Sequence, residues 1–173
     1  FPESHAASFA LLVYVSAWLK HHEPAAFLCA LLNSQPMGFY SASQLVQNAR
    51  REGVEVRPVD VNLSTVEHRL ESDGEQAPAV RLGLTLIRAL TQQAAERVIA
   101  RRPPTGYQTP GELQYRTGLN QPDLEALAAG GALRSLAENR HQARWDLLEP
   151  TMELALPDAA PSSSPEIASV MPS

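Results

Sequence analysis

Four arginines surround a short segment whose residues are suited to binding an anion. Thr91 lies where a new helical pattern begins, within residues 89–93. Its hydroxyl can accept a hydrogen bond from an otherwise unpaired N–H at the start of that helix. The remaining N–H groups and the partial positive charge of a helix start favour a phosphate. The residues predicted to contact phosphate are Arg88, Leu90, Thr91, Gln92, Gln93, Arg97, Arg101 and Arg102.

Two short helical segments must position this site. Apolar residues recur at helical spacing over residues 82–87 and again over residues 94–99. A helix, a tight turn and a second helix form the layout by which a helix-hairpin-helix binds nucleic-acid backbone independently of sequence. The turn of that motif normally has two glycines, and their places are taken here by Ala89 and Thr91. An ordinary helical hairpin with solvated arginines fits this stretch about equally well.

A second hairpin of similar size follows. Thr109 and Asn120 are predicted N-caps for helices over residues 109–117 and 121–129, and Glu112 completes a capping box with Thr109. Leu124, Leu127 and Ala128 form the predicted apolar face of the later helix. The two hairpins together resemble a degenerate tandem repeat. A final helix is predicted over residues 134–148.

The N-terminal half is predicted to contain three helices and a small β element. Residues 4–19, with Ser4 as N-cap, are apolar on nearly every side and are expected to be buried. Residues 25–32 and 43–51 form the next two helices. Alternating residues after Val54 and a turn signal at residues 72–75 predict short strands. The expected fold is therefore mainly α, with a small β element.

Composition narrows the function without naming it. The chain has 173 residues, is 44% hydrophobic and has a net charge of −5, so it does not have the overall positive charge typical of a nucleic-acid binder. From Arg81 to Arg144, however, nine arginines stand against five acidic residues. The single Cys29 excludes a disulfide within the chain and a cysteine-based metal site. No uninterrupted apolar segment is long enough to span a membrane, and no signal peptide is recognisable.

No strong catalytic arrangement is present. His21 and His22 are adjacent and make a poor metal pair, and the acidic residues are scattered. Asp60 and Asn62 are interpreted as side chains that stabilise a loop rather than as a catalytic site. His5, taken alone, is interpreted as a partly buried histidine at a helix end.

Several blocks of the chain are similar to the C-family bacterial DNA polymerases. FPESHAASFA at residues 1–10 is followed in order by AWLK, PAAF and ALLNS at 17–20, 24–27 and 30–34. Further matching blocks are GFY at 38–40, PVDVN at 58–62, RLGL at 81–84, AAER at 94–97 and LEALAA at 124–129. The chain resembles the α subunit of DNA polymerase III, and more closely the error-prone branch induced by DNA damage. The resemblance extends over about residues 1–148.

The resemblance implies a domain organisation. Residues 1–60 are expected to be the C-terminal part of the polymerase fingers, and residues 61–80 a small β hairpin or connector. Residues 81–148 are expected to form a tandem helix-hairpin-helix module that binds duplex DNA, and residues 149–173 a disordered linker. The catalytic aspartates of the family belong to a palm that precedes the fingers, and no residue here matches them. The fragment is therefore expected to be inactive by itself.

The resemblance also implies ligands and partners. Ser4 and His5 match a fingers segment near the incoming nucleotide and become candidate nucleotide-binding residues. The parent enzyme is expected to be a cytoplasmic nucleotidyltransferase for translesion synthesis and DNA repair. It is expected to use deoxynucleoside triphosphates and Mg²⁺, to bind primer–template DNA, and to meet other mutasome or repair polymerase subunits. The fragment itself is expected to hold no cofactor or metal and to bind no membrane.

Two alternatives from other classes remain open. The chain could be a non-catalytic helical interaction scaffold in a repair complex, or a stand-alone hairpin repair protein, although residues 1–60 disfavour the latter. The missing glycines leave room for the scaffold, because glycine lets a backbone approach a phosphate closely. The tail after Trp145 has no recognisable sliding-clamp peptide, so clamp binding is not predicted.

Overall fold

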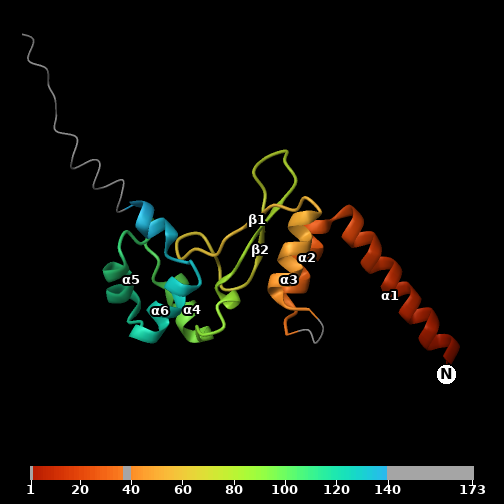
Figure 1. Cartoon of the computed structure of the whole chain (residues 1–173), viewed down its shortest axis with the longest axis horizontal. Coiled ribbons are helices and arrows are strands. Elements are labelled where there is room, and N and C mark those ends of the chain that lie inside the picture. The colour runs from red at the N-terminus through yellow and green to blue at the C-terminus, as the bar shows by residue number, and fades with distance from the viewer. Residues whose placement is uncertain (1, 37–39, 140–173) are drawn as a thin grey trace, which may run out of the picture.

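The computed structural model describes residues 2–36 and 40–139, and this part of the chain is mainly helical (Figure 1). Three helices come first: α1 (Pro2–His22), α2 (Pro24–Asn33) and α3 (Ala42–Arg51). Three short strands follow: β1 (Val56–Arg57), β2 (Arg69–Glu71) and β3 (Ala79–Arg81). A single 3₁₀ turn, η1 (Leu84–Leu86), then leads to α4 (Gln92–Ala100), α5 (Pro110–Thr117) and α6 (Gln121–Ala129). Residues 134–139 are helical too. The predicted fold class is confirmed.

The first helix, α1, departs from the sequence prediction in two ways. It begins at Pro2, so Ser4 lies inside the helix rather than at its N-cap. Its side chains are exposed from Glu3 to His22, whereas burial on most sides was predicted. The physical reason is visible in Figure 1, where α1 projects from the body of the chain and adjoins only the α2 end. Within the described residues, nothing covers its apolar sides.

The next two helices pack as predicted. Pro24 lies at the start of α2, a position where its missing N–H leaves no hydrogen bond unmade. Ala25, Leu28, Cys29 and Leu32 of α2 are buried. Ser41 caps α3 in a full capping box: its hydroxyl accepts from the Gln44 N–H, and the Gln44 side-chain oxygen accepts from the Ser41 N–H.

A three-stranded sheet connects these helices to the hairpins. The strand order is β1-β3-β2, with β1 parallel and β2 antiparallel to β3. All three residues of the central strand are buried, which fits a strand that is covered on both sides. The predicted pair of strands around the turn at residues 72–75 is confirmed. The predicted strand after Val54 is shorter than expected, because only Val56–Arg57 pairs with β3.

The helix predicted at residues 82–87 is only the 3₁₀ turn η1. The N–H groups of Leu84 and Thr85 donate instead to the carbonyls of Thr65 and Val66, at 3.0 Å each. These hydrogen bonds hold residues 84–85 beside the loop at residues 65–66. Gly83 makes the approach possible, since an added Cβ would lie 2.3 Å from the Glu67 backbone.

The other predicted caps are present. Thr91, Thr109 and Asn120 accept hydrogen bonds at the starts of α4, α5 and α6 respectively. One detail of the α5 cap was wrong, because the Glu112 carboxylate accepts from the Gln108 N–H instead of from Thr109. The apolar face of α6 also differs by position: Ala126 and Leu127 are buried, while Ala128 is exposed.

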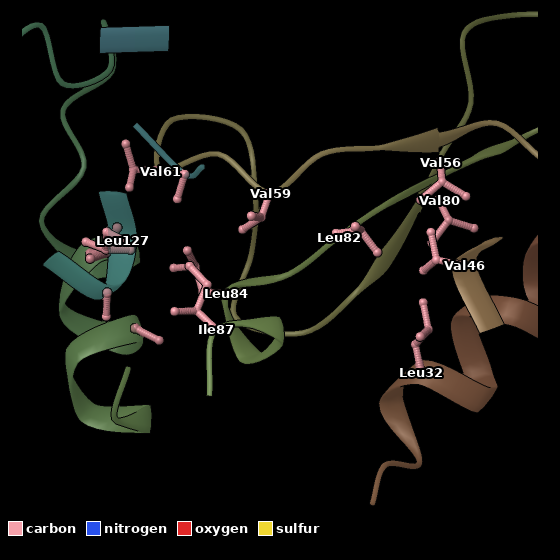
Figure 2. Close-up of a cluster of buried hydrophobic side chains, with 14 of the residues drawn as sticks. Leu32, Val46, Val56, Val59, Val61, Val80, Leu82, Leu84, Ile87 and Leu127 are labelled. Atoms are coloured by element: carbon pink, nitrogen blue, oxygen red, sulfur yellow. The ribbon is translucent and has the colours of Figure 1, made fainter. Parts of the chain in front are cut away.

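The hydrophobic core runs through the whole body (Figure 2). Leu32 and Val46 contribute from α2 and α3, Val80 from the sheet, and Leu84 and Leu127 from the hairpins. Because one cluster joins all these elements, the sheet and the hairpins are packed as a continuous unit. The predicted final helix is described only to residue 139, where Leu136 is buried. Its remainder, with Trp145 and Leu148, and the predicted linker at 149–173 lie outside the described residues.

Candidate nucleic-acid interface

The first hairpin, defined here as residues 84–100, has a helix start prepared for an anion. Thr91 Oγ1 accepts from the Ala94 N–H at 3.2 Å, which satisfies the third N–H of α4. The backbone N–H groups of Gln92 and Gln93 make no hydrogen bond to the described residues. The first turn of α4 has no acidic residue. Two exposed donors and the helix dipole therefore face solvent at this turn.

The second hairpin, residues 110–129, has a less suitable helix start. Its turn keeps a glycine, Gly118, in the left-handed conformation with φ 65°, and Leu119 after it is buried. The first turn of α6, however, contains Pro122, which has no N–H, and Asp123, whose carboxylate adds negative charge. Of the two helix starts, the one at α4 is therefore better suited to hold a phosphate.

The four predicted arginines divide into two kinds. Arg88 and Arg101 are exposed and have no side-chain hydrogen bond or ion pair with the described part of the chain. Arg97 donates from Nη1 to the carbonyls of Thr117 and Gly118, at 3.3 Å each. It thereby occupies carbonyls at the C-terminus of α5, where a cation is favoured. Arg97 joins the two hairpins.

Arg102 is also committed to the fold. Its Nε donates to the carbonyl of Val61 at 2.8 Å, and its Nη2 to that of Ser64 at 2.6 Å. Burial lowers the pKa of the Arg102 guanidinium, while nearby Tyr107 and Asp60 oppose this shift. Two of the four arginines predicted to bind phosphate thus hold backbone carbonyls. Their spacing gives no signal of this, because the carbonyls lie far away in the sequence.

A polar network around Asp60 fixes the loop that Arg102 holds. The Asp60 carboxylate accepts from the Asn62 N–H at 2.8 Å, and from the Ser135 hydroxyl and N–H at 2.9 and 3.2 Å. The Asn62 side chain bonds both the N–H and the carbonyl of Tyr107, at 2.7 and 2.9 Å. The interpretation of Asp60 and Asn62 as loop-stabilising residues is confirmed. Sequence reasoning missed Ser135 and Tyr107 as their partners.

The two hairpins are also in direct contact. An added Cβ at Gly130, just after α6, would lie 2.8 Å from Cγ1 of Ile87 in the first hairpin. In the segment that connects the hairpins, the buried Tyr107 donates its hydroxyl to the Val98 carbonyl of α4 at 2.7 Å. With Arg97, these contacts fix the turn of the first hairpin relative to the second.

The predicted nucleotide residues lie elsewhere. Ser4 and His5 are exposed in the first turn of α1, and the His5 ring stacks on Phe9 with centroids 6.3 Å apart. Figure 1 places the N-terminal end of α1 and the hairpins at opposite ends of the structure. The structure therefore does not bring Ser4 and His5 together with the first hairpin.

Residues 2–36 and 40–139 contain neither a metal-binding cluster nor a membrane-spanning helix. No group of three or more His, Cys, Asp or Glu side chains is arranged to hold a metal ion there. None of the helices in that part combines the length and the apolar character needed to cross a membrane. No described residue is therefore assigned to the Mg²⁺ that the polymerase resemblance implies.

A known protein family is similar to the part of the chain that contains the two hairpins. The model of the family described as "Helix-hairpin-helix motif" matches residues 53–143, which include the small sheet and both hairpins. The chain belongs to the helix-hairpin-helix motif family.

Relatives with curated names extend the similarity to the N-terminal helices. The chain is 57% identical over 148 residues to the error-prone DNA polymerase of Alkalilimnicola ehrlichii, covering 86% of this chain and 14% of that protein. It is 50% identical over 175 residues to that of Teredinibacter turnerae, covering 100% of this chain and 17% of the relative. The corresponding protein of Pseudomonas paraeruginosa is 53% identical over 156 residues, covering 89% of this chain and 15% of its own length. The resemblance to error-prone polymerases is confirmed, and the chain spans about one sixth of their length.

Proposed function

We propose that this chain is the fingers-end and helix-hairpin-helix portion of an error-prone DNA polymerase, and that it holds duplex DNA by its backbone. The observation that supports the duplex contact best is the start of α4. There, two unpaired N–H groups, the helix dipole and Arg88 are available, and Arg101 is an exposed cation just after the C-terminal end of α4. Such contacts bind phosphates without reading base sequence, which suits a polymerase that must move along DNA.

The missing glycines are compatible with this role. Ala89 and Thr91 occupy the glycine places, and no non-glycine residue in the described part of the chain has a positive φ. The turn therefore forms without strained backbone. Thr91 lacks the conformational freedom of glycine, but its side chain caps α4 and orders the first turn of that helix.

The same proposal assigns roles that depend on the rest of the polymerase. Ser4 and His5 would contribute to the pocket of the incoming deoxynucleoside triphosphate, and Mg²⁺ would be held by residues of the palm. The polymerase would act in the cytoplasm in translesion synthesis and DNA repair, together with other mutasome subunits. Within this portion, the chain's own contribution is to position the duplex.

Duplex binding across a salt series tests the proposal. The chain should bind a labelled primer–template duplex weakly and without sequence preference, and affinity should fall steeply as salt rises. The double variant Arg88→Ala/Arg101→Ala should reduce the slope of log K against log salt by about two. Arg51→Ala is the matched control, because Arg51 is an exposed arginine on α3, away from the hairpins. Absence of binding at low salt would refute the proposal.

A second function, a non-catalytic scaffold, is favoured by one observation. Arg97 and Arg102 hold backbone carbonyls, so two of the four arginines predicted to contact phosphate serve packing. A scaffold would dock through apolar surface, and its partner affinity would depend little on salt. The same salt series distinguishes the two functions.

A further inference from the structure

A cavity of about 430 Å³ lies between the helices α2 and α3 and the first hairpin. Leu32, Pro36 and Ala42 line it from the α2–α3 side, and Thr85 and Arg88 from the hairpin side. Ligand sites typically have volumes of roughly 300–1,000 Å³ and combine apolar walls with a few fixed polar groups. The size and lining of this cavity fit that description.

His68 is the fixed polar group of this cavity. It is only 6% exposed, and its Nδ1 accepts from the Gly83 N–H at 3.0 Å. The Asn33 side chain holds the His68 backbone at both its N–H and its carbonyl, at 2.9 Å each. Because Nδ1 accepts, the proton of the neutral ring is on Nε2. The Nε2–H has no acceptor among the described residues, so a rigid donor is available at the cavity.

The charges around the cavity favour a nucleotide over a free anion. Arg88 supplies a cation with no partner in the described part of the chain, and Thr85 supplies an exposed hydroxyl. Glu67 also lines the cavity, and its carboxylate would repel a simple anion. A nucleotide suits both features, since its phosphate can pair with Arg88 while an N–H of its base donates to Glu67. The apolar side would contact the sugar and the face of the base.

We propose that this cavity binds one unpaired nucleotide of the DNA strand whose duplex part is held by the first hairpin. Arg88 is adjacent in the chain to the turn at residues 89–91, so a strand that leaves the turn passes this side chain first. The inference rests on the proposed duplex contact and extends it by one single-stranded nucleotide. A duplex with an overhang would therefore bind more tightly than a blunt duplex of the same length.

The test compares three labelled duplexes that share the same base-paired part: one blunt, one with a 5′ overhang of six thymidines and one with the same overhang at the 3′ end. One overhang should raise affinity by about fivefold, as expected for two or so new hydrogen bonds. Equal affinities for all three duplexes would overturn this inference and leave the proposed duplex contact intact. If the blunt duplex does not bind at all, the proposed function is refuted, and this inference with it.

Two variants locate the effect. Ala42→Leu fills the cavity without changing a donor or the hairpin, and it should abolish the overhang preference while blunt-duplex affinity stays within twofold. Thr85→Val replaces the hydroxyl with a methyl group of similar size and should weaken the preference in part. The control is Ala128→Leu, the same change at an exposed site on α6. An overhang preference that survives Ala42→Leu in a folded protein, checked by circular dichroism, would contradict the assignment to this cavity.

Discussion

Arg97 on α4 donates a hydrogen bond from Nη1 to the carbonyl of Gly118, in the turn of the second hairpin, at 3.3 Å. The same nitrogen donates to the Thr117 carbonyl. An arginine that the sequence places among phosphate contacts is therefore a connection between two hairpins. Replacing Arg97 should therefore affect the stability of the fold as well as any DNA binding.

Replacing Arg97 should lower stability more than replacing its neighbour. Arg97→Ala removes the hydrogen bonds to the α5 C-terminus and should reduce the free energy of unfolding by about 1 kcal/mol, measured by urea denaturation. Arg101→Ala is the control, because Arg101 is exposed and makes no side-chain hydrogen bond or ion pair with the described residues, so its loss should change stability by less than about 0.5 kcal/mol. Equal losses for both variants would argue against the connecting role.

The hydrogen bonds around Asp60 predict that a nearly isosteric substitution there lowers stability more than Arg97→Ala does. Asp60→Asn replaces one accepting oxygen by an amide group that would face the N–H of Asn62 or Ser135. A buried donor would then face a donor, and stability should fall by about 2 kcal/mol in urea denaturation. Glu138→Gln is the control: Glu138 is exposed on the helix that contains Ser135, and its substitution should leave stability unchanged. A neutral Asp60→Asn would show that the network contributes little.

Glu71 should make stability depend on pH. Burial alone would raise the pKa of its carboxyl, but hydrogen bonds from Arg81, Arg57 and Arg69 outweigh burial and lower that pKa to about 2. Because the folded pKa lies below the unfolded value, the ionised carboxylate stabilises the fold fully above about pH 4.5. This contribution decreases as pH falls toward 2.

The measurement for Glu71 is urea unfolding of wild type and Glu71→Gln at several pH values. The variant should be less stable at pH 7, and the gap between the two proteins should narrow as pH falls below about 4.5. Glu125→Gln, at an exposed site on α6, is the control. A stability difference that stays constant across this range would contradict the role of the ionised carboxylate.

The open sides of α1 predict self-association of the isolated chain. Leu12 is 64% and Tyr14 68% exposed, in a helix with many apolar neighbours. Large exposed apolar surfaces of this kind promote association. Sedimentation should show concentration-dependent oligomers, and Leu12→Glu should shift the population toward monomer. The control is Ala129→Glu at the exposed end of α6, which should leave association unchanged.

Local signals predicted much of the fold correctly. Thr91, Thr109 and Asn120 each marked a helix start, because a cap depends on residues only three positions apart. The strands around the turn at residues 72–75 were predicted for the same local reason. The failures depend on distant partners: η1 stays short because Leu84 and Thr85 bond the loop at residues 65–66.

The candidate site was predicted only in part for a similar reason. The turn and the Thr91 cap follow from spacing, and the structure confirms that cap. Charge pattern alone could not separate Arg88 and Arg101, which remain exposed, from Arg97 and Arg102, which bond carbonyls 20 or more positions away. His68 gave no signal in the sequence, since the cavity that it lines is formed by segments that are far apart along the chain.

The central claim is that the first hairpin, and not the second, holds the phosphate, and a matched pair of substitutions tests it most directly. Gln92 and Gln121 occupy the same first position of α4 and α6, and each donates its side-chain amide to a glutamate four residues later, at 3.0 and 3.2 Å. Gln92→Glu and Gln121→Glu therefore have similar structural costs, but each places a negative charge at a different helix start. Duplex affinity at low salt should fall about fivefold or more for Gln92→Glu and less than about twofold for Gln121→Glu. An equal or larger loss for Gln121→Glu would contradict the account.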